Sequence, residues 1–246
     1  MDLSRTKIVS AAKILPEELR ESLEQLDEFP DRQLEAIRGI LAGSDGLTMA
    51  TKALERVVAT SEYLEEMGSS SFEHPNGFDS IPLELNLPNY RVRLHIWWPD
   101  SNGVIEDVHN HAWDFGSLIL CGSLRFVTFA LADAGLPFFH YPYRFGEHEE
   151  ATSTQPQVAY LRSTLDASLA AGTYYSFSHT QLHRVVAEGG GHPVATFVIT
   201  GTVRRDGSDV YVEKKRVGGY RLLKHPFGAE KLKARLERLL VELNSA

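Results

Sequence analysis

GVIEDVHNHAWDFGSLILCG, residues 103–122, is the stretch that decides the fold of this chain. It holds two histidines one residue apart, His109 and His111. On an extended segment both side chains project from the same face, because strand side chains alternate with a period of two. Neutral imidazole is the commonest metal ligand among protein side chains. The pair therefore supplies about half of the ligands of a divalent-metal site, and the strand already holds their backbone in place.

A third candidate ligand, His183, closes a second glycine-led segment, GTYYSFSHTQLH at residues 172–183. Three histidines on an octahedral ion leave up to three positions open, which suits Fe(II) holding a substrate and O2 together. Zn, Ni, Mn and Cu remain alternatives, because the order of affinities does not choose among divalent ions. We therefore expect one divalent metal, with Fe(II) favoured, at His109, His111 and His183.

The two segments resemble the paired motifs of the cupin family. The first cupin motif is a Gly, five residues, His-x-His, three or four residues, Glu, six residues and a Gly. Gly103, His109, His111 and Gly122 stand at those spacings, and Phe115 occupies the position of the Glu. The resemblance covers roughly residues 90–201 and implies a jelly-roll β-barrel.

In the second cupin motif a Gly is followed by five residues, a Pro, one residue, a Gly, two residues and a His. Gly172 and His183 match this pattern, whereas Ser178 and Thr180 replace its Pro and second Gly. A three-histidine cupin without the Glu is similar to the thiol dioxygenases, the cysteine dioxygenase branch. That resemblance implies iron-dependent oxidation of a small thiol by O2.

The chain departs from this branch on the strand after the third ligand. Thr196, Val198 and Thr200 stand where the branch carries a Ser-His-Tyr relay, so its His and Tyr are missing. The resemblance therefore implies the metal site more directly than it implies cysteine as the substrate.

Phe115 in the usual Glu position removes a negative charge from the site. A divalent ion with three neutral ligands keeps its full charge and attracts an anionic substrate such as a thiolate or carboxylate. Asp107 shares the parity of His109 and is expected beside the ligands. Asp114 has the opposite parity and is expected on a solvent-side turn.

The strand RVRLHIW at residues 91–97 places Arg93 and His95 on one face. An arginine inside a barrel is costly unless it is paired, so Arg93 is predicted to hold a substrate carboxylate and to act in catalysis. The alternative is that this face is solvated, with Leu94 and Ile96 pointing inward.

Four further side chains are candidates for the cavity. His179, four residues before His183, is predicted as an acid/base, with a fourth ligand or a plain loop residue as alternatives. Tyr175 is a second catalytic candidate. Trp113 and Tyr174, with Phe115, are predicted to line the substrate pocket, although aromatic residues in a barrel also serve as core.

Composition narrows the function classes. The chain has 246 residues, a net charge of −8, 43% hydrophobic residues and one cysteine, Cys121. The negative charge argues against nucleic acid as a partner, and no basic amphipathic stretch suggests a membrane surface. One cysteine excludes an internal disulfide and fits a reducing compartment. With no signal-peptide pattern, we expect a cytoplasmic location, a small-molecule substrate with O2, and a possible homodimer.

Three regions follow from hydrophobic periodicity and turn signals. Residues 1–75 are predicted as a helical segment, opened by Pro16, with Asp31 capping a second helix and a third over residues 48–67. This segment is a packing appendage or, alternatively, a lid or dimer surface. Ten short strands separated by turn residues follow within residues 76–216 and predict the barrel. Residues 217–246 complete the chain with an amphipathic helix over residues 226–244.

The leading interpretation is an all-β core of the cupin jelly-roll type with flanking helices. Its predicted function is a mononuclear Fe(II)-dependent dioxygenase acting on a small polar, anionic metabolite such as a thiol or amino-acid derivative. One alternative is a non-redox isomerase or lyase that uses the metal as a Lewis acid. A third possibility is a cupin that binds a ligand without catalysis.

Overall fold

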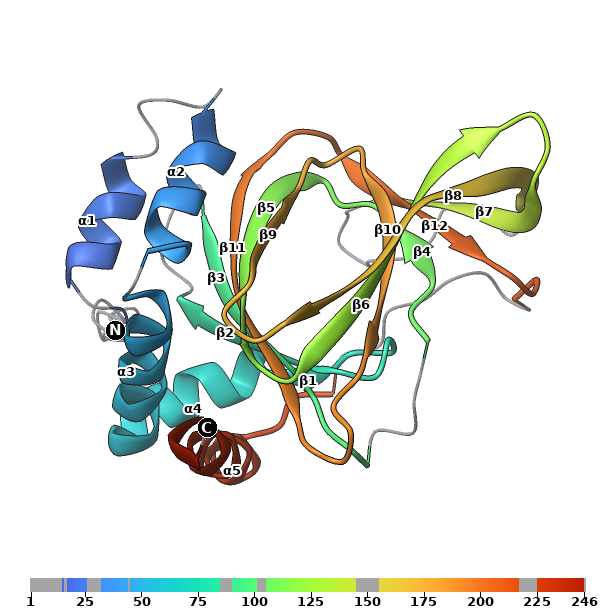
Figure 1. The fold of residues 1–246 in the computed structure, drawn as a ribbon. Coiled ribbons are helices and arrows are strands. Elements are labelled where there is room, and N and C mark those ends of the chain that lie inside the picture. The colour runs from blue at the N-terminus through green and yellow to red at the C-terminus, as the bar shows by residue number, and fades with distance from the viewer. Residues whose placement is uncertain are drawn as a thin grey trace, which may run out of the picture.

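The structure is a computed structural model and describes residues 15, 17–25, 32–43, 45–84, 90–100, 105–144, 155–216 and 225–245. Within these residues, four helices precede the strands: α1 (Glu17–Gln25), α2 (Gln33–Leu41), α3 (Gly46–Ala59) and α4 (Ser61–Ser70). One helix, α5 (Ala229–Ser245), follows them (Figure 1). Among the described residues the strands are β1 (Phe72–Glu73), β2 (Asp79–Glu84), β3 (Arg91–Trp97), β4 (Val108–His109), β5 (Trp113–Cys121), β6 (Ser123–Ala132), β7 (Leu136–Arg144), β8 (Gln157–Ala170), β9 (Tyr174–Phe177), β10 (Leu182–Ala187), β11 (Val194–Val203) and β12 (Gly207–Val212).

The strands form two antiparallel sheets. One sheet has six strands in the order β1-β2-β3-β11-β5-β9, and the other six strands close a ring in the order β10-β4-β12-β7-β8-β6. Figure 1 looks along the space between β11 and β5 on one side and β10 and β6 on the other. This arrangement confirms the predicted all-β core and fits a jelly-roll barrel.

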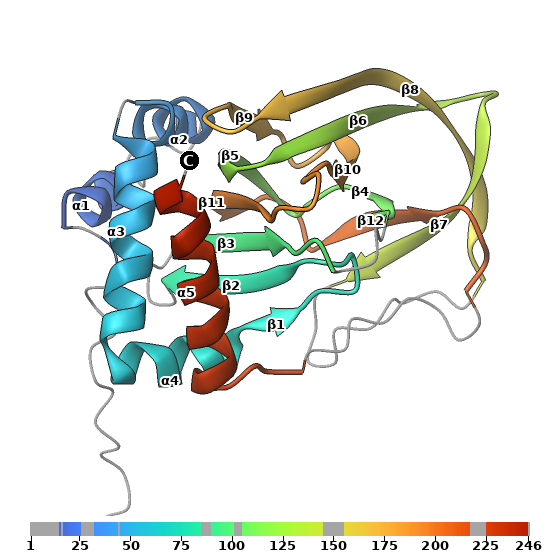
Figure 2. The ribbon, with the colours of Figure 1, turned by 60° about the horizontal axis from the view of Figure 1, so that its bottom comes forward.

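The five helices of the described part of the chain lie on one side of the barrel, against the outer face of the first sheet (Figure 2). Strand β3 shows why they pack there: Val92, Leu94 and Ile96 are fully buried in the same core as Leu232 and Leu236 of α5. Burying a leucine or isoleucine side chain stabilises the fold by roughly 1.5–3 kcal/mol. The helices and the outer face of this sheet therefore share one core, and the proposed boundary at residue 75 remains a prediction.

Two predicted elements differ from the structure. The helix over residues 48–67 is two helices, α3 and α4, because Thr60 adopts an extended conformation (φ −124°, ψ 111°). Strand β7 was not predicted, because Pro137 and Pro142 interrupt a run that otherwise reads as a strand. Three residues that signal helix starts or the first motif lie outside the described residues: Pro16, Asp31 and Gly103.

A turn glycine links the first motif to the barrel. Gly122 has φ +73° between β5 and β6, and a Cβ there would lie 2.8 Å from Cγ2 of Val194. Both facts require glycine, as its position at the end of the motif suggested. Among the described helices, none is long and apolar enough to cross a membrane.

Candidate metal centre

The three predicted ligands converge. His109 of β4 and His183 of β10 are directly paired across antiparallel strands, and His111 follows two residues after His109. The ring centroids are 4.7 Å apart for His109–His183, 4.9 Å for His109–His111 and 5.2 Å for His111–His183. One nitrogen from each ring lies within 4.8 Å of the other two. The common-face prediction from the His-x-His spacing therefore agrees with this geometry.

Backbone carbonyls orient two of the rings. Nδ1 of His109 donates to the carbonyl of Asp107 at 2.8 Å, and Nδ1 of His183 donates to the carbonyl of Gln181 at 3.1 Å. Because Nδ1 carries the proton, the Nε2 lone pair is left for a metal. Asp107 therefore supports the ligand through its main chain, while its carboxylate pairs with Arg216.

Burial keeps the imidazoles neutral. It lowers the pKa of His109, lowers that of His111 well below its ordinary value, and lowers that of His183 to about 3. A neutral imidazole is the form that binds a metal. Three neutral, oriented nitrogen donors fit a divalent ion such as Fe(II), Zn(II) or Ni(II), and the chemistry of the donor set does not select among them.

Asn110, between the two motif histidines, is held by Asp209 of β12. The amide of Asn110 donates to Oδ2 of Asp209 at 3.1 Å, and the main-chain N–H of Asp209 donates to Oδ1 of Asn110 at 2.7 Å. The carboxylate of Asp209 is also bonded to His140 at 2.9 Å and to Arg205 at 2.6 Å. These bonds lower the pKa of Asp209, with His140 the largest cause. This network fixes the backbone that carries both ligands.

A cavity of about 840 Å³ opens beside the three histidines. Trp113, Phe115 and Tyr175 line it, and the ring centroid of Phe115 lies 4.9 Å from that of His111. Burial raises the pKa of the Tyr175 phenol, which therefore stays protonated. The structure thus places these three side chains at the site, while their roles remain predictions.

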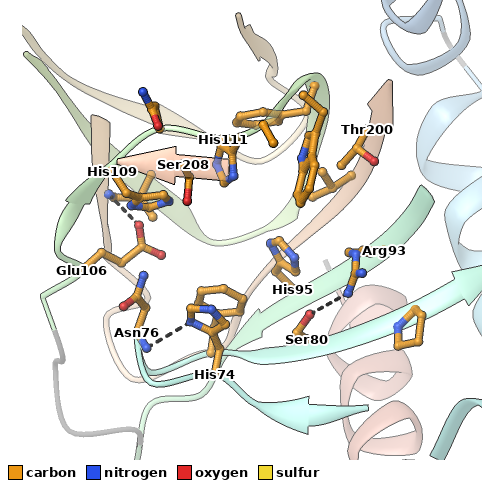
Figure 3. A pocket seen from close by; sticks show the side chains of 18 of the residues that line it. His74, Asn76, Ser80, Arg93, His95, Glu106, His109, His111, Thr200 and Ser208 are labelled. Atoms are coloured by element: carbon orange, nitrogen blue, oxygen red, sulfur yellow. Dashed lines mark hydrogen bonds between the residues drawn. The ribbon is translucent and has the colours of Figure 1, made fainter. Parts of the chain in front are cut away.

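Arg93 and His95 lie on another wall of the same cavity (Figure 3). Nη1 of Arg93 donates to Oγ of Ser80 at 3.4 Å. Burial, with Arg93 as the next cause, lowers the pKa of His95 to about 3. The alternative of a solvated face is wrong, because Leu94 and Ile96 pack toward the helices and leave Arg93 for the cavity.

Glu106 is a buried acid that the sequence pattern did not predict. It is 4% exposed, lines the cavity, and accepts a hydrogen bond from the main-chain N–H of Val185 at 3.1 Å (Figure 3). Desolvation raises its pKa to about 8. Its position three residues before His109 was the available signal, but that segment gave no reason to expect a carboxyl inside.

The buried carboxyl of Glu106 predicts how the stability of the metal-free protein depends on pH. The unfolded carboxyl ionises near pH 4.5, whereas the folded one keeps its proton to about pH 8. The folded state therefore binds more protons in that window, and the free energy of unfolding falls as pH rises from 4.5 to 8. Glu106→Gln should flatten this part of the profile in denaturant titrations. An unchanged slope would contradict the burial of an ionisable carboxyl here.

Two predicted site residues lie elsewhere. Tyr174 points toward the helices, where its hydroxyl donates to the carbonyl of Leu34 at 3.3 Å, because neighbouring residues on β9 face opposite sides. His179 does not line the cavity: its Nδ1 lies 2.8 Å from Oδ1 of Asp114, which also accepts its main-chain N–H at 2.7 Å. The predicted substrate contact and acid/base role are corrected accordingly. Asp114 anchors this turn.

Comparisons of this chain with known proteins show a similarity of fold and nothing beyond it. No protein-family model matches the sequence and no curated protein matches it. A cupin superfamily protein from Desulfitobacterium hafniense DCB-2 is 11% identical with a TM-score of 0.29, over 50% of this chain and 75% of that chain. A hydroquinone 1,2-dioxygenase is 19% identical, with a TM-score of 0.32 and coverages of 49% and 62%. Oxalate decarboxylase from Bacillus subtilis is 12% identical, with a TM-score of 0.34 and coverages of 56% and 29%. At such low values these structures carry no inference about the reaction.

Proposed function

We propose that this chain is a mononuclear metal-dependent dioxygenase that uses Fe(II) and acts on a small polar, anionic metabolite such as a thiol or amino-acid derivative. The observation that carries the proposal is the set of three neutral imidazoles beside a cavity, with Phe115 instead of a carboxylate next to them. Fe(II) on such a ligand set supplies open positions at which a substrate and O2 meet.

The side chains of the cavity have separate roles in this proposal. His109, His111 and His183 hold the ion, and the aromatic walls restrict water around it. Arg93 binds the anionic group of the substrate, since guanidinium matches a carboxylate in a bidentate manner. Because the three ligands are neutral, the charge of the ion also favours an anion.

The test uses protein purified without chelator and reconstituted anaerobically with Fe(II). O2 uptake is measured against a panel of small thiols and amino acids, with the His183→Ala protein as the control. The proposal predicts uptake that depends on substrate, on iron and on His183. Substrate turnover that proceeds equally without O2 would contradict the dioxygenase assignment.

A non-redox isomerase or lyase is the second candidate, favoured by one observation. Glu106, whose pKa is raised to about 8 by burial, lines the metal cavity and is suited to proton transfer near neutral pH. In that reaction the metal would polarise the substrate as a Lewis acid. Turnover without O2 that is lost in Glu106→Gln would favour this candidate.

Phe115→Glu gives a prediction on the charge of the site. The centroid of the Phe115 ring lies 4.9 Å from that of His111. A carboxylate in place of this ring should strengthen the binding of a divalent metal and weaken the binding of anionic ligands. Calorimetric titrations with Zn(II), then with 3-mercaptopropionate, measure both effects. Phe115→Gln is the control, because glutamine has the same size as glutamate but carries no charge. If neither affinity changes, Phe115 does not face the ion.

A further inference from the structure

The cavity has two binding ends that belong to different strands. The metal end lies beside Phe115 of β5, and the cationic end is Arg93 of β3. Strand β11 runs between them: Thr200 pairs with Phe115, and Val198 pairs with Arg93. Two strand spacings separate β5 from β3, which is roughly 9.5 Å of backbone.

The Arg93 side chain does not shorten this gap. Its Nη1 lies 3.4 Å from Oγ of Ser80, which belongs to β2, the strand on the side of β3 away from β11. Figure 3 shows Arg93 and Ser80 together on the wall across from His109 and His111. In a two-carbon thiol acid such as cysteine, sulfur and carboxylate lie much closer than two strand spacings.

The lining of the cavity as a whole is more apolar than polar. Val198 and Trp113 are among its apolar lining residues, and His95 and Thr200 are among the polar ones (Figure 3). Trp97, which also lines the cavity, is packed against Phe78, with ring centroids 5.1 Å apart. A cavity of about 840 Å³ falls in the range that encloses a drug-sized ligand rather than a single small amino acid.

We infer that the substrate is an acid with an extended apolar body, whose carboxylate binds Arg93 while a donor atom at its other end binds the metal. This inference rests on the proposed function, since it requires the metal to bind the substrate directly. Within the proposed class of anionic thiols it selects those longer than cysteine, in which a longer apolar chain separates the two polar ends.

The test is a series of unbranched ω-mercapto acids, from mercaptoacetate to 8-mercaptooctanoate, titrated anaerobically into Fe(II)-loaded protein by calorimetry. Each buried methylene should tighten binding by about fourfold until the chain spans the gap. The ω-mercapto alcohols of equal length measure the same effect without the carboxylate. We expect the tightest ligand to be an acid longer than 3-mercaptopropionate, bound at least tenfold more tightly than its alcohol.

Two variants separate the contribution of Arg93. Arg93→Gln should remove the advantage of the acids over the alcohols, whereas Arg91→Gln, at an exposed position on the same strand, should keep it. Metal content and far-UV spectra show that both variants are folded and loaded. Tightest binding by mercaptoacetate or 3-mercaptopropionate would overturn the inference alone. Equal binding of all thiols to loaded and metal-free protein would overturn it together with the proposed function.

Discussion

Replacing His183 with alanine is expected to strip the divalent metal from the protein while the fold survives. The two remaining histidines cannot fix the geometry of the ion. The loss of metal affinity should therefore exceed the roughly 10–100-fold loss that follows removal of a residue that only supports a ligand. The metal-free barrel retains its cores, because most buried apolar residues lie away from the three ligands. Plasma mass spectrometry on protein reconstituted with one equivalent of Fe(II) or Zn(II) measures the effect.

His192→Ala is the matched control, because His192 is an exposed histidine whose Nδ1 lies 3.2 Å from Glu242. It should keep full metal content. His109→Ala and His111→Ala should behave as His183→Ala does. Stoichiometric metal in His183→Ala protein would refute the three-histidine site, and the dioxygenase proposal would fall with it.

Disrupting the bonds between Asn110 and Asp209 is expected to have the second-largest effect. Asp209→Ala removes the carboxylate that holds the Asn110 amide and leaves His140 and Arg205 without their acceptor. The main-chain bond between Asn110 and Asp209 remains, but the Asn110 side chain loses one of its two bonds to residue 209, so the segment from His109 to His111 should be held less firmly. We expect a roughly 10–100-fold weaker metal affinity and a loss of about 1–3 kcal/mol in unfolding free energy.

Asp206→Ala, at an exposed position just before β12, is the control for removing a carboxylate nearby. A merely structural role for Asp209 would lower the free energy of unfolding and leave the metal dissociation constant of the folded protein unchanged. Titration with a competing chelator separates the two outcomes. Affinity equal to that of the parent protein would therefore contradict a positioning role.

The ligands could be predicted because their signal is local. Residues one apart on an extended segment share a face whatever surrounds them, so His109 and His111 needed no knowledge of the fold. His183 needed only a second glycine-led segment. The same alternation places Tyr174 and Tyr175 on opposite faces of their strand. The sequence did not show which of these two faces the helices cover.

Arg93 shows where local pattern fails. Both faces of β3 carry large side chains, and the sequence alone left open whether its arginine face was solvated. The answer depends on helices far away in the chain, which bury Leu94 and Ile96. His179 fails for another reason: a spacing of four relates neighbours on a helix, whereas His179 lies in a turn before β10 begins at Leu182.

The most direct test of the central claim is X-ray absorption at the metal edge of protein loaded with one equivalent of Fe(II) or Zn(II). Three imidazoles from His109, His111 and His183 should give a first shell of nitrogen or oxygen scatterers at about 2.1 Å with outer-shell scattering from three rings. The His183→Ala protein, forced to bind by excess metal, should show two. A spectrum of the parent protein with no imidazole scattering, or with that of a single ring, would contradict the account.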